Sequence, residues 1–157
     1  MNSDKQLRRA EVTYRNLCKA LDKIDCKYEK SDDKLSVQFT ANGNDIPMPC
    51  LMHVDPVRQQ ISLLSVIPVT VEQDKRCELA IATSYANYNL ADGNFDLDLE
   101  RGTITFRVTS SFRDSVINNN LFYYMVQCAG AVVDKYNDKF MALNKGEMTI
   151  EEFIEGK

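Results

Sequence analysis

One histidine and five cysteines are the side chains of this 157-residue sequence that could form a thiol–imidazole catalytic pair. His53 is the only histidine, which excludes histidine-rich zinc sites and any mechanism that needs two imidazoles. A thiol enzyme would need a cysteine beside His53 and a third group to orient the imidazole, and no spacing in the sequence imposes that geometry. We therefore interpret His53 as a structural histidine in a strand. A thiol enzyme is the alternative, which a cysteine of depressed pKa beside His53 would support.

The cysteines also bear on the compartment. They are odd in number, widely spaced and without a C-x-x-C pair, at Cys18, Cys26, Cys50, Cys77 and Cys128. We expect reduced, mostly buried thiols, which fit a reducing compartment. No apolar run approaches the ~18 residues of a membrane span, and the first residues lack a signal-peptide core. The sequence therefore predicts a cytoplasmic protein that does not bind membranes.

Acidic residues alternate with apolar ones near the middle of the chain, a pattern that could indicate a calcium-binding loop. Calcium is bound by several closely spaced oxygen atoms. The acids and their amide neighbour are Asp92, Asn94, Asp96, Asp98 and Glu100. The calcium-loop template needs glycine at its sixth position and glutamate at its twelfth, where this chain has Leu97 and Thr103. The six glycines are too far apart for a phosphate-binding loop. We therefore predict no catalytic residue, no metal and no cofactor.

The charge is unevenly distributed along the chain. The net charge is −4, yet residues 1–30 carry eight lysines or arginines against five acids. The remainder is acidic, whereas a strong grip on nucleic acid normally needs a basic domain. No nucleic-acid partner is expected. Arg8, Arg9, Arg15 and Lys19 could meet an acidic partner, although a solvated helix face explains them more simply.

Hydrophobic periodicity predicts the elements that would position any site. Apolar spacings of three and four from Leu7 to Ile24 predict an amphipathic helix, and alternation over 35–40 predicts a strand. Asn42-Gly43-Asn44 predicts a hairpin turn into 46–54, and the apolar run 61–69 predicts a third strand closed by Pro68.

The second half alternates helices with one hairpin. Thr70 and Gln73 match a capping box for a second helix. Its expected inner face holds Cys77, Ala80, Ile81, Ser84, Tyr85 and Tyr88. Alternation over 95–99 and 104–108 predicts a hairpin, and a long apolar helix should run from Asn118 to Asn144-Lys145-Gly146. Gly130 inside that helix indicates close approach of another backbone. Thr149 and Glu152 predict a capping box for a last short helix.

This order of elements predicts an α+β fold in which helices pack on an antiparallel sheet of about five strands. The order is α-β-β-β-α-β-β-α. We expect a single domain over 1–146, followed by a short acidic helix or tail over 147–157.

A family resemblance rests on the hairpin and the residues before it. The stretch Ala86-Asn87-Tyr88-Asn89 leads to Gly93-Asn94-Phe95-Asp96-Leu97-Asp98, then to Gly102-Thr103-Ile104-Thr105-Phe106-Arg107 and the long helix. Over roughly residues 7–142 the chain resembles the YbjN family of proposed bacterial sensory transduction regulators, similar in fold to type III secretion chaperones. The resemblance implies a bacterial cytoplasmic protein with a regulatory or chaperone-like role, and it supplies no catalytic residues.

A surplus of large side chains near strand edges and helix starts indicates a binding surface. These residues are Met48, Met52, Phe112, Phe122, Tyr123 and Tyr124. Methionine and aromatic residues are enriched at interface cores, although each of these could instead complete the protein core. We predict a non-enzymatic protein-binding module, a chaperone-like or adaptor protein in bacterial stress or signalling that could form a homodimer. The alternative is a sensor of a small molecule or peptide, with an apolar pocket between sheet and helices.

Overall fold

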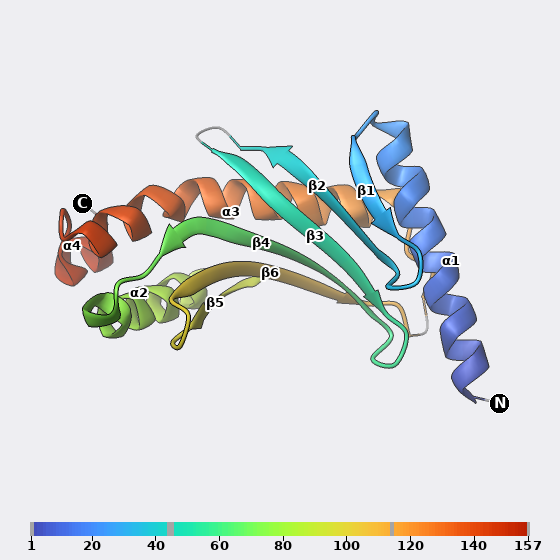
Figure 1. Cartoon of the computed structure of the whole chain (residues 1–157), viewed down its shortest axis with the longest axis horizontal. Coiled ribbons are helices and arrows are strands. Elements are labelled where there is room, and N and C mark those ends of the chain that lie inside the picture. Colours follow the sequence, from blue (N-terminus) through green and yellow to red (C-terminus); the bar gives the residue numbers. More distant parts are fainter. Residues whose placement is uncertain (1, 44–45, 114, 157) are drawn as a thin grey trace.

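The computed structural model describes residues 2–43, 46–113 and 115–156, and it shows one antiparallel sheet with helices behind it (Figure 1). The helices are α1 (Asn2–Lys23), α2 (Arg76–Tyr88), α3 (Asn119–Lys145) and α4 (Ile150–Glu155), with a short 3-10 helix, η1 (Gln73–Lys75), before α2. The strands are β1 (Tyr28–Ser31), β2 (Ser36–Asn42), β3 (Pro47–Asp55), β4 (Gln60–Thr70), β5 (Asn94–Asp98) and β6 (Thr103–Ser111).

The sheet has the strand order β1-β2-β3-β4-β6-β5, and every neighbouring pair is antiparallel. The predicted α+β class is therefore confirmed, with one strand more than expected. Periodicity missed β1 because its four residues, Tyr28-Glu29-Lys30-Ser31, are mostly polar and form an edge strand that buries little. The predicted return of β3 along β2 is also confirmed, although Asn44 of the predicted turn lies outside the described residues.

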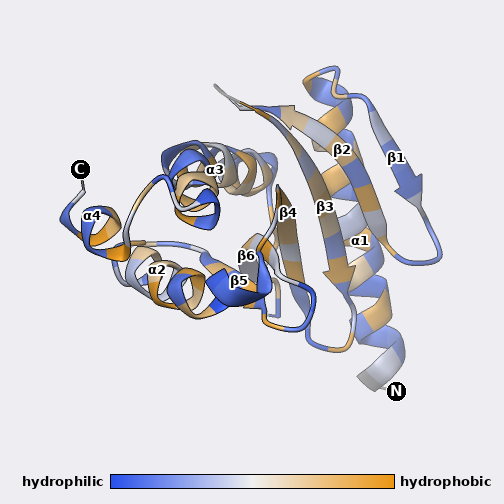
Figure 2. Ribbon diagram, turned by 60° about the vertical axis from the view of Figure 1, so that its left-hand side comes forward, coloured by the Kyte–Doolittle hydropathy of each residue, from blue (hydrophilic) through white to orange (hydrophobic). Residues whose placement is uncertain are grey.

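Alternation along the strands turns one face of the sheet towards the helices. Phe39, Cys50, Ser65 and Phe106 are paired in register across β2, β3, β4 and β6, and all four are buried. Helix α3 packs over β2, β4 and β6, and α1 packs on β3 and α3. Helix α2 lies beside β5 and contacts α3 and α4. The opposite face of the sheet carries no helix in the part of the chain that the structure describes (Figures 1 and 2).

Five rings form the centre of the packing between sheet and helices, here called the aromatic core cluster. Its members are Phe95, Phe106, Tyr136, Phe140 and Phe153. The centroid of the Phe140 ring lies 5.0 Å from that of Phe95 and 5.6 Å from that of Phe153. Aromatic pairs at such separations add about 0.5–1.5 kcal/mol each beyond the burial of their area. The cluster thus joins β5, β6, α3 and α4 into one core.

The connection from β4 to α2 differs from the prediction. Strand β4 continues past Pro68 to Thr70, because the pairing with β6 is irregular between Val66 and Thr70 and no regular ladder bond is needed from the proline. The capping box predicted for Thr70 and Gln73 is wrong, since Thr70 still belongs to the strand and Glu72 precedes the 3-10 turn.

Predictions at the ends of α3 and α4 are largely confirmed. Asn118 caps α3 through a side-chain oxygen, and Gly146 ends it in the left-handed region, at a φ of 73°. The capping box of Thr149 and Glu152 is present. The expectation for Gly130 is wrong, because a Cβ there would meet only the methyl group of Met48, at 3.6 Å, rather than another backbone.

Candidate binding surfaces

The six residues predicted to bind a partner do not form one exposed cluster. Met48, Met52, Phe112 and Phe122 are each at most 2% exposed and belong to the hydrophobic core. This corrects the expectation of a shared exposed surface. The reason is that a six-stranded sheet under two long helices needs more large side chains to fill its core than the predicted five-stranded sheet would.

The two tyrosines at the start of α3 have separate environments. The Tyr123 hydroxyl donates a hydrogen bond of 2.9 Å to the backbone carbonyl of Ala20, so it ties α3 to α1. Tyr124 is 45% exposed, and its hydroxyl donates to the carboxylate of Asp92. This bond to an anion raises the pKa of Tyr124 to about 12. Partner binding by Tyr124 stays a prediction.

The arrangement around the single histidine matches no thiol enzyme. His53 lies on the open face of the sheet, in register between Ser36 and Ser62. Cys50 points to the opposite face, where burial raises the pKa of its thiol to about 11. Burial also raises the pKa of Cys26 and of Cys128. Raised pKa values disfavour the reactive thiolate. Within the described residues, no group of three side chains could hold a metal ion.

Helix α2 is apolar on two opposite faces. Its buried side consists of Leu79, Ala82, Thr83 and Ala86, which pack towards the sheet edge and α3. The residues predicted to face inward are mainly exposed instead, which corrects the expected orientation of this helix. A helix that is apolar all round is normally buried all round. The outward side of α2 instead leaves Ile81 and Tyr88 exposed, among the described residues, on a helix whose other side is packed.

We call this outward surface the α2 patch, and define it as Cys77, Ile81, Tyr85, Tyr88 and Ile154. On the helix the first four residues follow spacings of four, four and three, which places them on one side. Tyr88 is 90% exposed and Ile81 is 52% exposed. The Tyr85 hydroxyl donates a hydrogen bond of 2.9 Å to the backbone carbonyl of Ile154, which extends the patch onto α4. No member is charged, and exposed apolar patches of this kind mark interaction sites.

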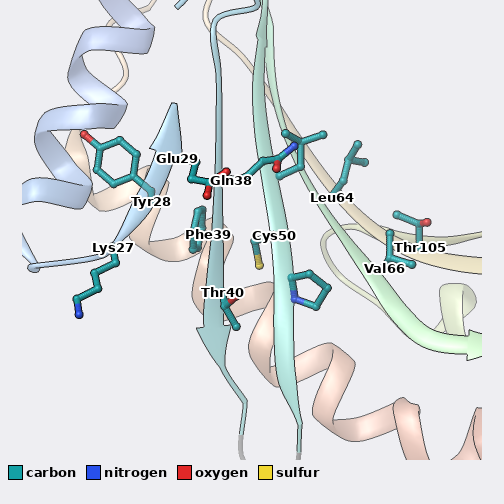
Figure 3. A pocket seen from close by; sticks show the side chains of 12 residues that line it. Lys27, Tyr28, Glu29, Gln38, Phe39, Thr40, Cys50, Leu64, Val66 and Thr105 are labelled. Atoms are coloured by element: carbon teal, nitrogen blue, oxygen red, sulfur yellow. The ribbon is translucent and has the colours of Figure 1, made fainter. Parts of the chain in front are cut away.

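The open face of the sheet holds a second candidate surface, a hollow of about 690 Å³ (Figure 3). Its apolar centre is formed by Pro49, Leu51, Leu64 and Val66 from β3 and β4. Gln38, Thr40 and Thr105 border this centre, with Lys27 and Glu29 at the β1 side. The same hollow continues towards α1, because Gln38 and Leu51 also line a neighbouring depression beside Leu7 and Glu11. The surface can bury apolar side chains within a rim of hydrogen-bonding groups.

Two tyrosine–aspartate hydrogen bonds fasten the β1 side of this hollow to α1. The Tyr14 hydroxyl of α1 donates to Asp32 at 2.9 Å, and the Tyr28 hydroxyl of β1 donates to Asp22 of α1 at 2.9 Å. Burial and the bond to Asp22 raise the pKa of Tyr28 above its usual range. The bond from Tyr14 lowers the pKa of the Asp32 carboxyl. Sequence reasoning missed both pairs because their members are 18 and 6 residues apart in different elements.

No helix in the described part of the chain is long and apolar enough to span a bilayer.

No protein-family model matches the sequence, and no curated protein matches it either. The fold of the chain is nevertheless similar to that of solved structures. The crystal structure of YbjN from E. coli, described as a candidate transcription regulator, superposes with a TM-score of 0.61 at 14% sequence identity. The match covers 78% of this chain and 90% of that one.

The chain has the fold of YbjN. The fold is also found in a chain of the HopA1–SchA chaperone–effector complex, with a TM-score of 0.54, 14% identity and coverage of 86% of this chain and 95% of the other. Both comparisons confirm the fold that the resemblance implied, namely that of YbjN and of type III secretion chaperones. At this level of identity the YbjN likeness is one of fold.

Proposed function

We propose that this protein is a non-enzymatic protein-binding module, a chaperone-like or adaptor protein in bacterial stress or signalling. In this proposal it pairs with a second copy of itself through the α2 patch. It holds a partner protein on the open face of the sheet. The observation that carries the proposal is the apolar outward side of α2, with Ile81, Tyr85 and Tyr88 exposed over a helix whose opposite side is already buried. Burying such side chains is the main gain of protein association.

The composition of the α2 patch favours a second copy as its occupant. The chain has a net charge of −4, so two copies repel each other over much of their surface. The patch contains no charged residue, and burying it therefore desolvates no ion. In a two-fold pair the same patch must fit itself. Ala80 and Ser84 leave room beside Ile81 and Tyr85, so that two α2 helices can interdigitate.

A dimer formed in this way leaves the open face of the sheet for a partner. The apolar centre of the hollow, with its rim of Gln38, Thr40 and Thr105, suits a peptide segment that buries a few side chains and bonds to the rim. The chaperone–effector complex of the same fold is consistent with a protein partner. The sensor alternative is less well supported, because the aromatic core cluster fills the space beneath α3 where a pocket was expected.

The partner surface is tested by crosslinked capture of tagged protein from its native cells. We expect a specific partner with the unchanged chain and its loss with the double variant Leu51→Asp/Leu64→Asp. The matched control is Val57→Asp, which alters an isolated apolar side chain, 78% exposed, at the β3–β4 turn. Capture of one partner by both variants would contradict a binding site on the open face. Turnover of a substrate that His53→Ala abolishes would contradict the non-enzymatic assignment.

A further inference from the structure

A groove lies between the first half of α1 and the segment that joins β6 to α3. Its floor is apolar and consists of Val12, Phe112, Val116 and Ile117. Val116 is 85% exposed, whereas Ile117 beside it and Phe112 in the same segment are buried. Phe112, one of the residues predicted from the sequence to bind a partner, is almost fully buried within this floor. The groove encloses about 390 Å³.

The side of the groove is positively charged. Lys5, Arg8 and Arg9 line it, and no acidic side chain does so among the described residues. Arg9 donates a hydrogen bond to the backbone carbonyl of Arg113, which fastens the segment to α1 and keeps the groove in shape. Lys5 and Arg8 are exposed and have no ion pair within the described part of the chain. Lys5 and Arg8 therefore place two exposed positive charges beside an apolar floor, in a chain of net charge −4.

We propose that this groove binds an acidic segment of the partner protein, with carboxylates against Lys5 and Arg8 and an apolar side chain on Val12 and Val116. The proposal rests on the protein-binding function and adds the chemistry of the partner. From Lys5 to Asn16, α1 rises by roughly 16 Å, which an extended peptide covers with about five residues. One apolar residue flanked by acids is therefore the unit that fits.

Two features favour a peptide over an anionic membrane. The binding surface is concave, and the apolar side of α1, with Leu17 and Leu21, is already buried in the protein core, so α1 cannot lie in a bilayer by that side. The acidic remainder of the chain would also be repelled by anionic lipids. A short peptide can bind in the groove without bringing the rest of the acidic chain against an anionic surface.

The test uses the full-length protein and a fluorescein-labelled peptide of about six residues, in which glutamates surround a leucine. A second peptide has glutamine in place of each glutamate. We expect the acidic peptide to bind in fluorescence anisotropy, and the Lys5→Glu/Arg8→Glu variant to lose roughly tenfold or more in affinity. Added salt should weaken binding, because exposed charges are screened. The matched control, Lys19→Glu/Lys23→Glu, makes the same change of charge on exposed positions of α1 outside the groove and should bind as the unchanged chain does.

Reversing the charges of both the groove and the peptide shows whether the Lys5→Glu/Arg8→Glu variant loses affinity through its charge or through misfolding. Lys5→Glu/Arg8→Glu should bind a peptide with lysine in place of glutamate better than the unchanged chain does. Equal binding of the acidic and glutamine peptides would overturn the proposal, and so would equal losses in the two charge variants. Sedimentation with phosphatidylserine vesicles, lost in Lys5→Glu/Arg8→Glu while the acidic peptide fails to bind, would overturn it in favour of a membrane. The Ile81→Glu/Tyr88→Glu variant, which changes the α2 patch, should keep peptide binding. A loss of dimerisation can therefore be distinguished from a loss of peptide binding in the groove.

Discussion

The aromatic core cluster and the α2 patch contain the same kinds of side chain in opposite situations. In the cluster, Phe140 lies between Phe95 and Phe153 and has no exposed surface. In the patch, Tyr88 is almost fully exposed, although it belongs to a helix whose other side is packed. The two regions meet at α4, where Phe153 enters the cluster and the backbone of Ile154 accepts the bond from Tyr85. Residue type therefore does not distinguish a core from an interface, and the difference lies in which face the fold has already covered.

The largest expected contrast between the two regions is in stability. Phe140→Ala removes a ring with no exposed surface and leaves a cavity, so we expect it to lower the free energy of unfolding by about 3–5 kcal/mol. Tyr88→Ala should change it by less than about 0.5 kcal/mol in protein dilute enough to be monomeric, because the side chain is then in water. Chemical denaturation of both variants checks this. Similar losses would mean that the patch belongs to the folded core of one copy.

Thiol labelling gives the next largest contrast. Cys77 in the α2 patch is exposed, whereas Cys50 is buried on the inner face of β3. A pKa raised to about 11 lowers the thiolate fraction of Cys50 about a hundredfold near neutral pH, relative to an ordinary thiol. With a thiol reagent followed by mass spectrometry, we expect Cys77 to react well before Cys50 in dilute protein. At high protein concentration, labelling of Cys77 should slow if the patch is covered by a second copy. Labelling of Cys77 that is independent of concentration would argue against such coverage.

A smaller effect is expected where the two regions join. Thr149→Ala removes one half of the capping box of α4 and should cost about 1 kcal/mol, roughly a fivefold change in the folding equilibrium. The loss should loosen α4 and with it the Ile154 end of the patch. Denaturation together with hydrogen exchange of the α4 amides measures both. If the α4 amides exchange no faster in the variant, α4 is held by Phe153 alone.

Much of the fold was predictable, because its signals are local. The alternation of Ile104, Phe106 and Val108 and the capping box of Thr149 each predicted an element that the structure contains. The edge strand β1 was missed because four mostly polar residues carry no periodic signal, and the extension of β4 beyond Pro68 depends on its pairing with β6.

The binding surfaces were less predictable, and α2 explains why. Periodicity identified the stripe of Ile81, Tyr85 and Tyr88 but placed it inside, because large apolar residues normally face the core. The structure instead buries the smaller Ala82 and Ala86, which let the helix approach β5 and α3 closely. Which of two apolar faces turns inward is decided by tertiary packing. The charged groove has the same origin, since Lys5 and Val116 are brought together only by the fold.

The central claim is that the α2 patch pairs with a second copy of the chain. The most direct test is the molar mass in solution, measured by light scattering over a range of concentrations. We predict a species of twice the 17.9 kDa chain, which Ile81→Glu/Tyr88→Glu converts to a stable monomer and Val57→Glu does not. A monomer at every concentration, or a dimer that survives Ile81→Glu/Tyr88→Glu, would contradict the account.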